Sequence, residues 1–225
     1  MIGIIGAMKV EIEAIEDLMT NKEEIKIGTL SFIKGLINNK DVVVAVCGIG
    51  KVFAGICAQT MCLNFKLDYL LNVGVAGSLS KNLGIANIAI SKDLVQHDMD
   101  TSPLGDPKGL ISGINIIKIP ANKELIEKIE KASKESDLKY EVGTIASGDQ
   151  FIVDGEKKME IIKNFSPIAC EMEGAAIAQV AYVNNVPFCV IRAISDNADG
   201  SSPISYMEFT KIAVQNSKKL ISKLI

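Results

Sequence analysis

Ionisable side chains follow an apolar stretch in the C-terminal part of the chain. Residues 188–194 are apolar except for Arg192, the only arginine in the sequence, and Ser195 and Asp196 come next. The β-branched, apolar composition after Pro187 predicts a buried strand. Ligands of open α/β sheets bind beyond the carboxyl ends of strands, so a cation in this strand and a carboxylate at its exit favour a ligand site. The alternative is a polar turn with a capping aspartate.

A second candidate carboxylate lies on the apolar face of the first predicted helix, residues 9–19. Ile12, Ile15 and Leu18 form one stripe of this helix, and Glu11 falls inside the stripe. Burial there would raise its pKa towards the range of a general base. Alternatively, Glu11 lies at the edge of the stripe near the helix N-terminus, where a negative charge is favourable. The helix by itself favours neither interpretation.

A third acidic segment, Cys170-Glu171-Met172-Glu173-Gly174, predicts the start of a helix that continues to about Asn184. Glu171 and Glu173 would lie about 200° apart on that helix, so we expect only one of them to face a ligand. An inward carboxylate is a natural acceptor for a vicinal diol, which presents two hydroxyl donors.

The elements that must position these residues alternate along the chain. Short apolar runs predict strands at 2–5, 29–37, 41–47, 69–73, 85–90, 141–146 and 188–194. Amphipathic or small-residue stretches predict helices at 9–19, 51–65, 121–136, 170–184 and 205–225. This alternation predicts a single α/β domain over residues 1–225, with a central mixed sheet flanked by helices.

Glycine-containing turns follow three of these predicted strands. Gly48-Ile49-Gly50 resembles a dinucleotide fingerprint, but Phe53 occupies the third glycine position, and the segment lacks the Ser or Thr of a Walker loop. Neither NAD nor ATP is therefore indicated, and we expect Ile49 to lie beside a ligand cleft. We expect a turn at residues 74–78 to allow close approach to a flat ligand, and Phe151 and Ile152, after another turn, to sandwich a planar base.

Composition excludes several classes of function. The 225 residues are 48% hydrophobic with a net charge of −3, which argues against broad electrostatic capture of nucleic acid or an anionic membrane. No apolar run reaches the roughly 18 residues of a membrane span, and no secretory signal is evident, so we expect a cytoplasmic protein. The five cysteines form no Cys-x-x-Cys pair. His97 is the sole histidine, which makes a zinc site or a Ser-His-Asp hydrolase a poor fit, and no metal is expected.

Four stretches, in this order, resemble a known family: 3–8 with Glu11, 72–77, 146–152, and 171–174 followed by 192–199. Over its full length the sequence is similar to the 5′-methylthioadenosine/S-adenosylhomocysteine nucleosidases of the purine nucleoside phosphorylase superfamily. The resemblance implies the nucleoside phosphorylase fold. It also implies hydrolysis of the adenine–ribose bond without metal or cofactor, in methionine salvage and recycling of S-adenosylmethionine by-products. 5′-Deoxyadenosine is a further implied substrate, and an aminodeoxyfutalosine is not excluded.

The resemblance also implies roles for individual residues. Asp196 matches the acid that protonates adenine N7, oriented by Ser195, and Glu11 matches the carboxylate that activates the attacking water. Glu173 matches the acceptor of the ribose hydroxyls, and Arg192 matches a residue near the ribose and the water. The other matched substrate-binding positions are Met8, Ile49 and Tyr206 around the 5′-thio group, Phe151, Ile152 and Gly77 around adenine, Met172 beside Glu173, and Ala76 and Ala198.

Two positions depart from the family pattern. Leu104 matches a position that is normally aromatic and is supplied by the second subunit of a homodimer, and Val75 stands where many members have serine. Two alternatives to hydrolysis stay open. A phosphorylase of the same fold would need a phosphate site, for which related phosphorylases place an arginine at the position of Asn72. A nucleoside-binding protein without catalysis would lack the acid or the base, although both Glu11 and Asp196 are present.

Overall fold

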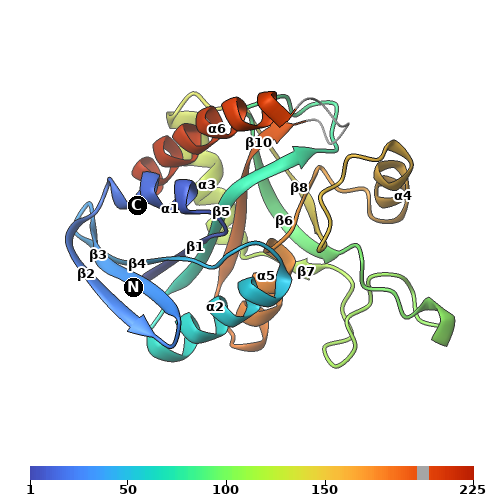
Figure 1. Cartoon of the computed structure of the whole chain (residues 1–225), viewed down its shortest axis with the longest axis horizontal. Coiled ribbons are helices and arrows are strands. Elements are labelled where there is room, and N and C mark those ends of the chain that lie inside the picture. Colours follow the sequence, from blue (N-terminus) through green and yellow to red (C-terminus); the bar gives the residue numbers. More distant parts are fainter. Residues whose placement is uncertain (197–202) are drawn as a thin grey trace.

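The computed structural model describes residues 1–196 and 203–225, and the side chains of all of these except 203–207 (Figure 1). The strands are β1 (Ile2–Gly6), β2 (Thr20–Ile27), β3 (Leu30–Ile37), β4 (Lys40–Val46), β5 (Tyr69–Ser78), β6 (Ile88–Gln96), β7 (Ile119–Pro120), β8 (Tyr140–Ser147), β9 (Ala169–Glu171) and β10 (Phe188–Asp196). The helices are α1 (Lys9–Glu16), α2 (Lys51–Asn64), the short 3₁₀ helix η1 (Ser102–Leu104), α3 (Lys123–Glu135), α4 (Gly155–Phe165), α5 (Gly174–Val183) and α6 (Pro203–Leu224).

The strands form one mixed sheet in the order β10-β6-β8-β9-β5-β1-β4-β3-β2, and β7 pairs with β6. β5 also pairs with β10, which closes β5, β10, β6, β8 and β9 into a ring. β1, β4, β5 and β10 run parallel to their neighbours in this half of the sheet, so their carboxyl ends meet at one edge. The predicted α/β fold with a central mixed sheet is confirmed.

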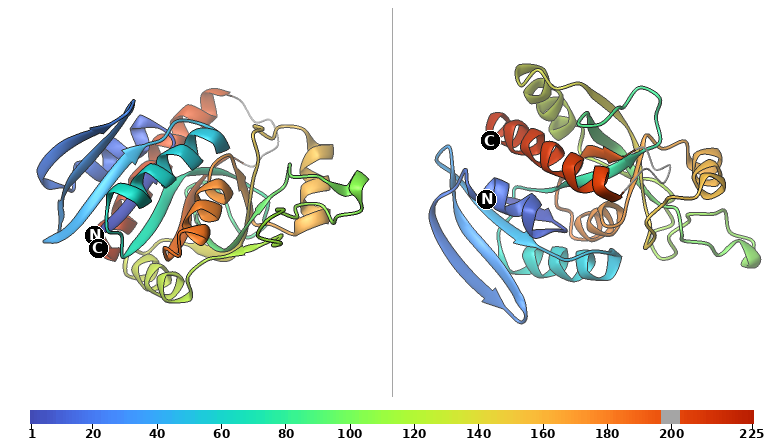
Figure 2. Two further views of the ribbon diagram at one scale, coloured as in Figure 1. Left: turned by 90° about the horizontal axis from the view of Figure 1, so that it is seen from below. Right: turned by 45° about the horizontal axis from the view of Figure 1, so that its top comes forward.

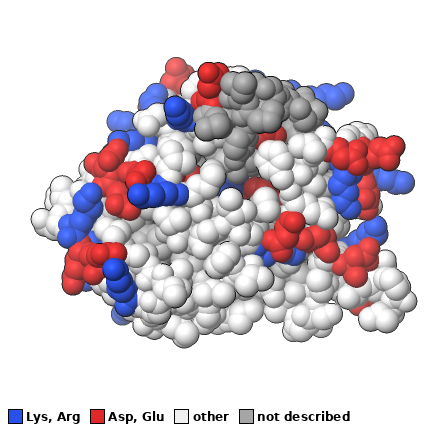
Figure 3. Space-filling model, viewed as in Figure 1, with Lys and Arg blue, Asp and Glu red and all other residues white. Residues whose placement is uncertain are grey.

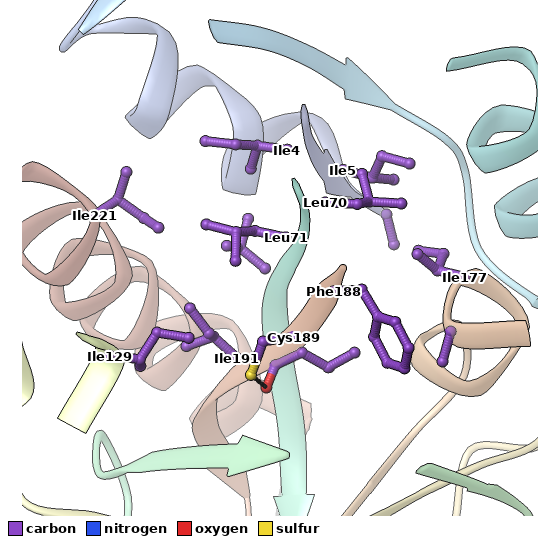
Figure 4. Close-up of a cluster of buried hydrophobic side chains, with 14 of the residues drawn as sticks. Ile4, Ile5, Leu70, Leu71, Ile129, Ile177, Phe188, Cys189, Ile191 and Ile221 are labelled. Carbon is purple, nitrogen blue, oxygen red and sulfur yellow. Dashed lines mark hydrogen bonds between the residues drawn. The ribbon is translucent and has the colours of Figure 1, made fainter. Parts of the chain in front are cut away.

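The centre of the sheet is buried on both faces, which explains the uninterrupted apolar runs in these strands. Alternate residues of β1 point to opposite sides: Ile4 lies towards α6 and Ile5 towards α5 (Figure 4). Leu71 and Leu70 of β5 divide in the same way. The side chains that meet them come from helices on the two faces, Ile129 and Ile221 on one and Ile177 on the other. Burying each such side chain contributes about 1.5–3 kcal/mol.

Helices cover both faces of the sheet (Figures 1 and 2). α1, α3 and α6 pack together on one face, and α2 and α5 pack together on the other. α4 and the segment around η1 lie at the outer end, beyond the closed ring of strands. Within the described residues, no helix is both long enough and apolar enough to cross a bilayer.

The structure corrects several predicted boundaries. Residues 74–78, expected as a turn, continue β5, because they pair with β10 and β9. β6 begins at Ile88 and continues to Gln96, later than predicted. The helix predicted from residue 170 begins only at Gly174, because Ala169–Glu171 forms the strand β9 between β8 and β5. β2 and α4 were not predicted; β2 is an edge strand whose exposed polar and charged residues give no apolar run.

Candidate active site

A cavity enclosing about 640 Å³ of empty space, its open mouth included, lies where several strands of the sheet end. Its lining comes from the segments that follow β1, β4, β8 and β9, and from the ends of β5 and β10. This agrees with the rule that ligands of α/β sheets bind beyond the carboxyl ends of strands. Figure 3 shows a hollow near the middle of the molecule in this view, with an acidic side chain visible inside it.

Glu11 reaches this cavity from the first turn of α1, and only 4% of it is exposed. Its Oε2 atom accepts hydrogen bonds from the backbone N–H groups of Ala7 and Met8, both at 2.9 Å. Its Oε1 atom accepts a third, from Val75 N–H of β5, at 3.1 Å. Burial raises the pKa of Glu11, although Arg192 and these three N–H groups oppose the shift. Glu11 therefore accepts a hydrogen bond from the backbone N–H of Met8, the N-cap residue of its helix, and is also a buried carboxylate in the cavity.

β10 brings Arg192 and Asp196 to the other side of the cavity. Arg192 is 1% exposed, and its Nη2 atom donates to Asn72 Oδ1 at 2.5 Å and to Glu171. The register between β10 and β5 shifts between Ile194 and Asp196, which marks a β-bulge at Ser195. Bulges redirect side chains beside active sites. Here Ser195 Oγ donates to Asp196 Oδ2 at 2.9 Å.

Glu11 and Asp196 both contact the end of β5. Glu11 is bound to the backbone of Val75, and Asp196 pairs in register with Gly77. Two residues of extended strand span about 7 Å. Glu11 and Asp196 therefore approach the cavity at two points of one short piece of strand, with Ala76 between them.

Glu171 and Glu173 both belong to the cavity lining, but the side chain of Glu171 is 2% exposed and is bound within the wall. The prediction that both residues lie on one helix was wrong, because Glu171 ends β9 and Glu173 precedes α5. Glu173 Oε1 accepts from Gly50 N–H at 2.8 Å, and Glu173 Oε2 lies 3.6 Å from Arg192 Nη2. Burial raises the pKa of Glu173 to about 7; Arg192 opposes the shift and the Glu171 charge adds to it.

A polar cluster joins the two loops at the mouth of the cavity. Asp149 Oδ1 accepts from the backbone N–H of Lys51 at 2.8 Å, while the backbone N–H of Asp149 donates to Asp98 Oδ2 at 2.9 Å. Lys51 Nζ closes the ring on Asp98 Oδ1 at 2.7 Å. The ring ties the turn that carries Ile49 to the loop that carries Phe151.

The structure brings together most of the residues predicted for the site. Those that line the cavity are Met8, Glu11, Ile49, Ala76, Gly77, Phe151, Ile152, Met172, Glu173, Arg192, Ser195 and Asp196. Ala198 and the side chain of Tyr206 lie outside what the structure describes. Leu104 lies in η1, is 84% exposed and is not part of the lining. His97 is buried and does not line the cavity either; burial lowers its pKa.

Several lining residues were not predicted: Ala7, Val75, Gln150, Cys170 and Glu171. Ala7, Val75, Gln150 and Glu171 each adjoin a predicted residue, so their position next to a strand end was the available signal. Burial raises the pKa of the Cys170 thiol to about 12, so this side chain is a neutral part of the wall.

Comparison with known proteins assigns the chain to a family. The sequence profile described as the phosphorylase superfamily matches residues 1–225. A 5′-methylthioadenosine/S-adenosylhomocysteine nucleosidase of Staphylococcus aureus is 38% identical over 226 residues, which cover 100% of this chain and 99% of that protein. The chain belongs to this nucleosidase family.

Solved structures of nucleosidases with the same family name agree closely with the fold. The enzyme from Helicobacter pylori, solved with butyl-thio-DADMe-Immucillin-A, has a TM-score of 0.95 and 39% identity, covering 99% of this chain and 96% of that one. The enzyme from Neisseria meningitidis, solved with methylthio-immucillin-A, has a TM-score of 0.95 and 35% identity, covering 99% and 97%. The nucleosidase fold is thus shared over essentially the whole chain.

Proposed function

We propose that this protein hydrolyses the N-glycosidic bond of 5′-methylthioadenosine and S-adenosylhomocysteine, releasing adenine and the 5-substituted ribose. Family membership supports this reaction, and so does one observation above all. Glu11 and Asp196, far apart in sequence, line a single cavity and flank the same short piece of β5. A bond cleaved between an acid and a water needs two such groups on opposite sides.

The acid in this proposal is Asp196. When adenine leaves, the sugar becomes an oxocarbenium-like cation, and the purine must receive a proton as its C–N bond breaks. Asp196 gives that proton to N7, while the hydroxyl of Ser195 holds the Asp196 carboxyl in place at 2.9 Å. General acid catalysis contributes about 10²–10⁴-fold.

Glu11 is the base in this proposal. It orients a water on the opposite face of the sugar and takes the proton that this water loses as its oxygen bonds to the anomeric carbon. Three backbone N–H groups hold the carboxylate in one orientation, and burial raises its pKa, which makes it a stronger proton acceptor.

Glu173 and Arg192 hold the sugar. Glu173 accepts the ribose hydroxyls, and Met172 packs beside it. Arg192 Nε is buried and has no hydrogen-bond partner among the described residues, so it is available as a donor towards the ribose and the water. Phe151, 60% exposed at the mouth, stacks on adenine. Ile152, Ala76 and Gly77 complete the adenine end; Met8 and Ile49 receive the 5′-thio group.

Phosphorolysis is less well supported than hydrolysis by the charges in the cavity. Among the lining residues in the described part of the chain, Arg192 is the only basic one, and Glu171 and Glu173 already pair with it. Asn72, at the position where related phosphorylases have arginine, is buried and donates to the carbonyl of Ile5 at 2.8 Å. A phosphate in the cavity would therefore meet the carboxyl groups of Glu11, Glu171, Glu173 and Asp196 and a cation that is already paired.

Adenine release in phosphate-free buffer tests the proposal. We expect release from 5′-methylthioadenosine and S-adenosylhomocysteine at a rate that added phosphate leaves unchanged. Dependence on phosphate would replace hydrolysis with phosphorolysis, and tight binding without release would indicate a non-catalytic nucleoside-binding protein. The same assay with 5′-deoxyadenosine and an aminodeoxyfutalosine ranks the substrates.

The proposal includes a homodimer in which the Leu104 segment of one subunit approaches the site of the other. The exposed apolar side chains of α2 support an interface on this face: Val52, Phe53, Ile56 and Leu63. The exposed Val183 of α5 lines one surface depression together with Val52. Figure 3 shows a broad area over α2 without charged residues. An exposed apolar patch of this kind is typical of a protein interface.

A further inference from the structure

The carboxylate of Glu171 is bound by several groups within the cavity wall. Its carboxylate pairs with Arg192 and accepts from the hydroxyl of Ser147. Its Oε2 atom also accepts from the backbone N–H groups of Glu173, at 3.0 Å, and Gly174, at 2.7 Å. The side chain is 2% exposed, so each of these contacts is made away from water.

These contacts join three elements around one carboxylate. Arg192 belongs to β10, Ser147 ends β8, and Gly174 begins α5. Ser147 extends the arrangement, because its hydroxyl accepts from Ala175 N–H at 2.7 Å. The negative charge of Glu171 also lies at the N-terminus of α5, where it is favourable.

Glu171 is closely bound to both residues that we propose to hold the sugar. Its carboxylate binds the guanidinium group of Arg192 directly. It also accepts a hydrogen bond from the backbone N–H of Glu173, which holds the backbone that carries the Glu173 side chain. Without Glu171, Arg192 would keep Asn72 and the more distant Glu173 as polar partners. A displacement of about 1 Å in such groups can cost about 100-fold in rate.

We propose that Glu171 is a positioning residue, which holds Arg192 and the Glu173 backbone in the geometry that the sugar requires. This inference rests on the proposed function, because it assigns Arg192 and Glu173 to the ribose. Glu171 does not itself touch the reacting atoms in this account; it acts through its neighbours.

The charges around Glu173 link Glu171 to the pKa of Glu173, so a change at Glu171 should alter the pH dependence of the reaction. A purely structural residue would not have this effect. The charged groups that face Glu173 are Arg192 from β10, Glu171 from β9 and Glu11 from α1, and the neutral thiol of Cys47 lies nearby. The negative charge of Glu171 helps burial to raise the pKa of Glu173, and it also shares the positive charge of Arg192. Removing only that charge should therefore lower the pKa of Glu173.

The test compares Glu171→Gln, Glu171→Asp and the unmodified chain in adenine release from 5′-methylthioadenosine between pH 5 and 9. For Glu171→Gln we expect the maximum of kcat/KM across the pH profile to fall about 10- to 100-fold. We also expect the acid limb of this profile to move to lower pH by about one unit. Glu171→Asp keeps the charge but shortens the side chain, so its maximum should fall while its acid limb stays in place.

Asn122→Ala is the matched control, because Asn122 caps α3 through Leu125 N–H at 3.0 Å, away from the cavity lining. It should lower thermal stability without moving the pH profile. An unchanged Glu171→Gln profile, or a loss of rate with no movement of its acid limb, would overturn the positioning role. If Glu171→Gln does not fold, a Glu171→Asp profile identical to that of the unmodified chain overturns it instead. An unmodified chain that releases no adenine would remove the proposed function, and this inference with it.

Discussion

Gly74 lies against the carboxylate of Glu11: a Cβ added at this glycine would stand 2.8 Å from Glu11 Oε1. The same Cβ would overlap Nη1 of Arg192. Both neighbours are buried, so neither can move aside into solvent. Because Gly74 has no side chain, Glu11, the proposed base, and Arg192, the only arginine, can both lie against the backbone of β5 at this point.

Gly74→Ala should lower kcat/KM for adenine release at least about 100-fold, because the added methyl group must displace Glu11 or Arg192. Gly155→Ala is the control, since a Cβ at Gly155 meets nothing within 4 Å. Steady-state assays of both variants check this expectation. Equal activities of Gly74→Ala and Gly155→Ala would show that the close approach has no catalytic importance.

Asp196→Asn and Glu11→Gln should each lower turnover by at least about two orders of magnitude, because each removes a proton-transfer group. Single-turnover adenine release measures the chemical step, and circular dichroism checks that the fold is kept. Glu13→Gln serves as a control on the same helix as Glu11, because Glu13 is exposed. An Asp196→Asn or Glu11→Gln variant with near-normal turnover would lose its assigned role.

The stability of the ligand-free protein should depend on Glu173. Its pKa is raised from 4.5 to about 7, so the folded chain binds this proton more tightly than the unfolded chain does. The stabilisation is present below pH 4.5 and is lost as the pH rises through 7. The Tm of Glu173→Gln, which mimics the protonated form, should therefore exceed that of the unmodified chain by more at pH 8 than at pH 5. A Tm difference that does not change with pH would contradict the raised pKa.

Phe151→Ala should raise KM for 5′-methylthioadenosine about 10- to 100-fold with a smaller change in kcat, because stacking on a base contributes about 1–3 kcal/mol to binding. Val153→Ala removes a neighbouring exposed apolar side chain and should leave KM unchanged. Initial-rate kinetics on the two variants separate stacking on adenine from a general loss of apolar surface. The stacking role fails if both variants give the same KM.

Phe53→Glu should convert the proposed homodimer into monomers, because it places a charge in the apolar face of α2. Met159→Glu is the control: Met159 is equally exposed but lies on α4, at the outer end of the molecule. Sedimentation analysis gives the oligomeric state of each. If the unmodified chain is itself a monomer, the proposed role of Leu104 in a neighbouring site has no basis.

The sequence alone determined the α/β class and the positions of the central strands, because strands buried on both faces appear as short, continuous, β-branched apolar runs bounded by Gly or Pro. It also indicated Glu11 and Asp196 as candidates, since a carboxylate inside an apolar stripe or directly after a buried strand is uncommon without a reason. These signals are local, because each depends only on residues that are neighbours in the sequence.

Tertiary structure decided which acidic residues share a cavity. Glu171 and Glu173 seemed incompatible on a helix, and only the pairing of Ala169–Glu171 with β5 and β8 turned both towards Arg192. The extension of β5 to Ser78 has the same origin, because β9 and β10 supply the hydrogen bonds that keep small, glycine-rich residues extended. Pairing between strands distant in sequence leaves no periodic trace in either strand, so this part of the site could not be derived before the fold was known.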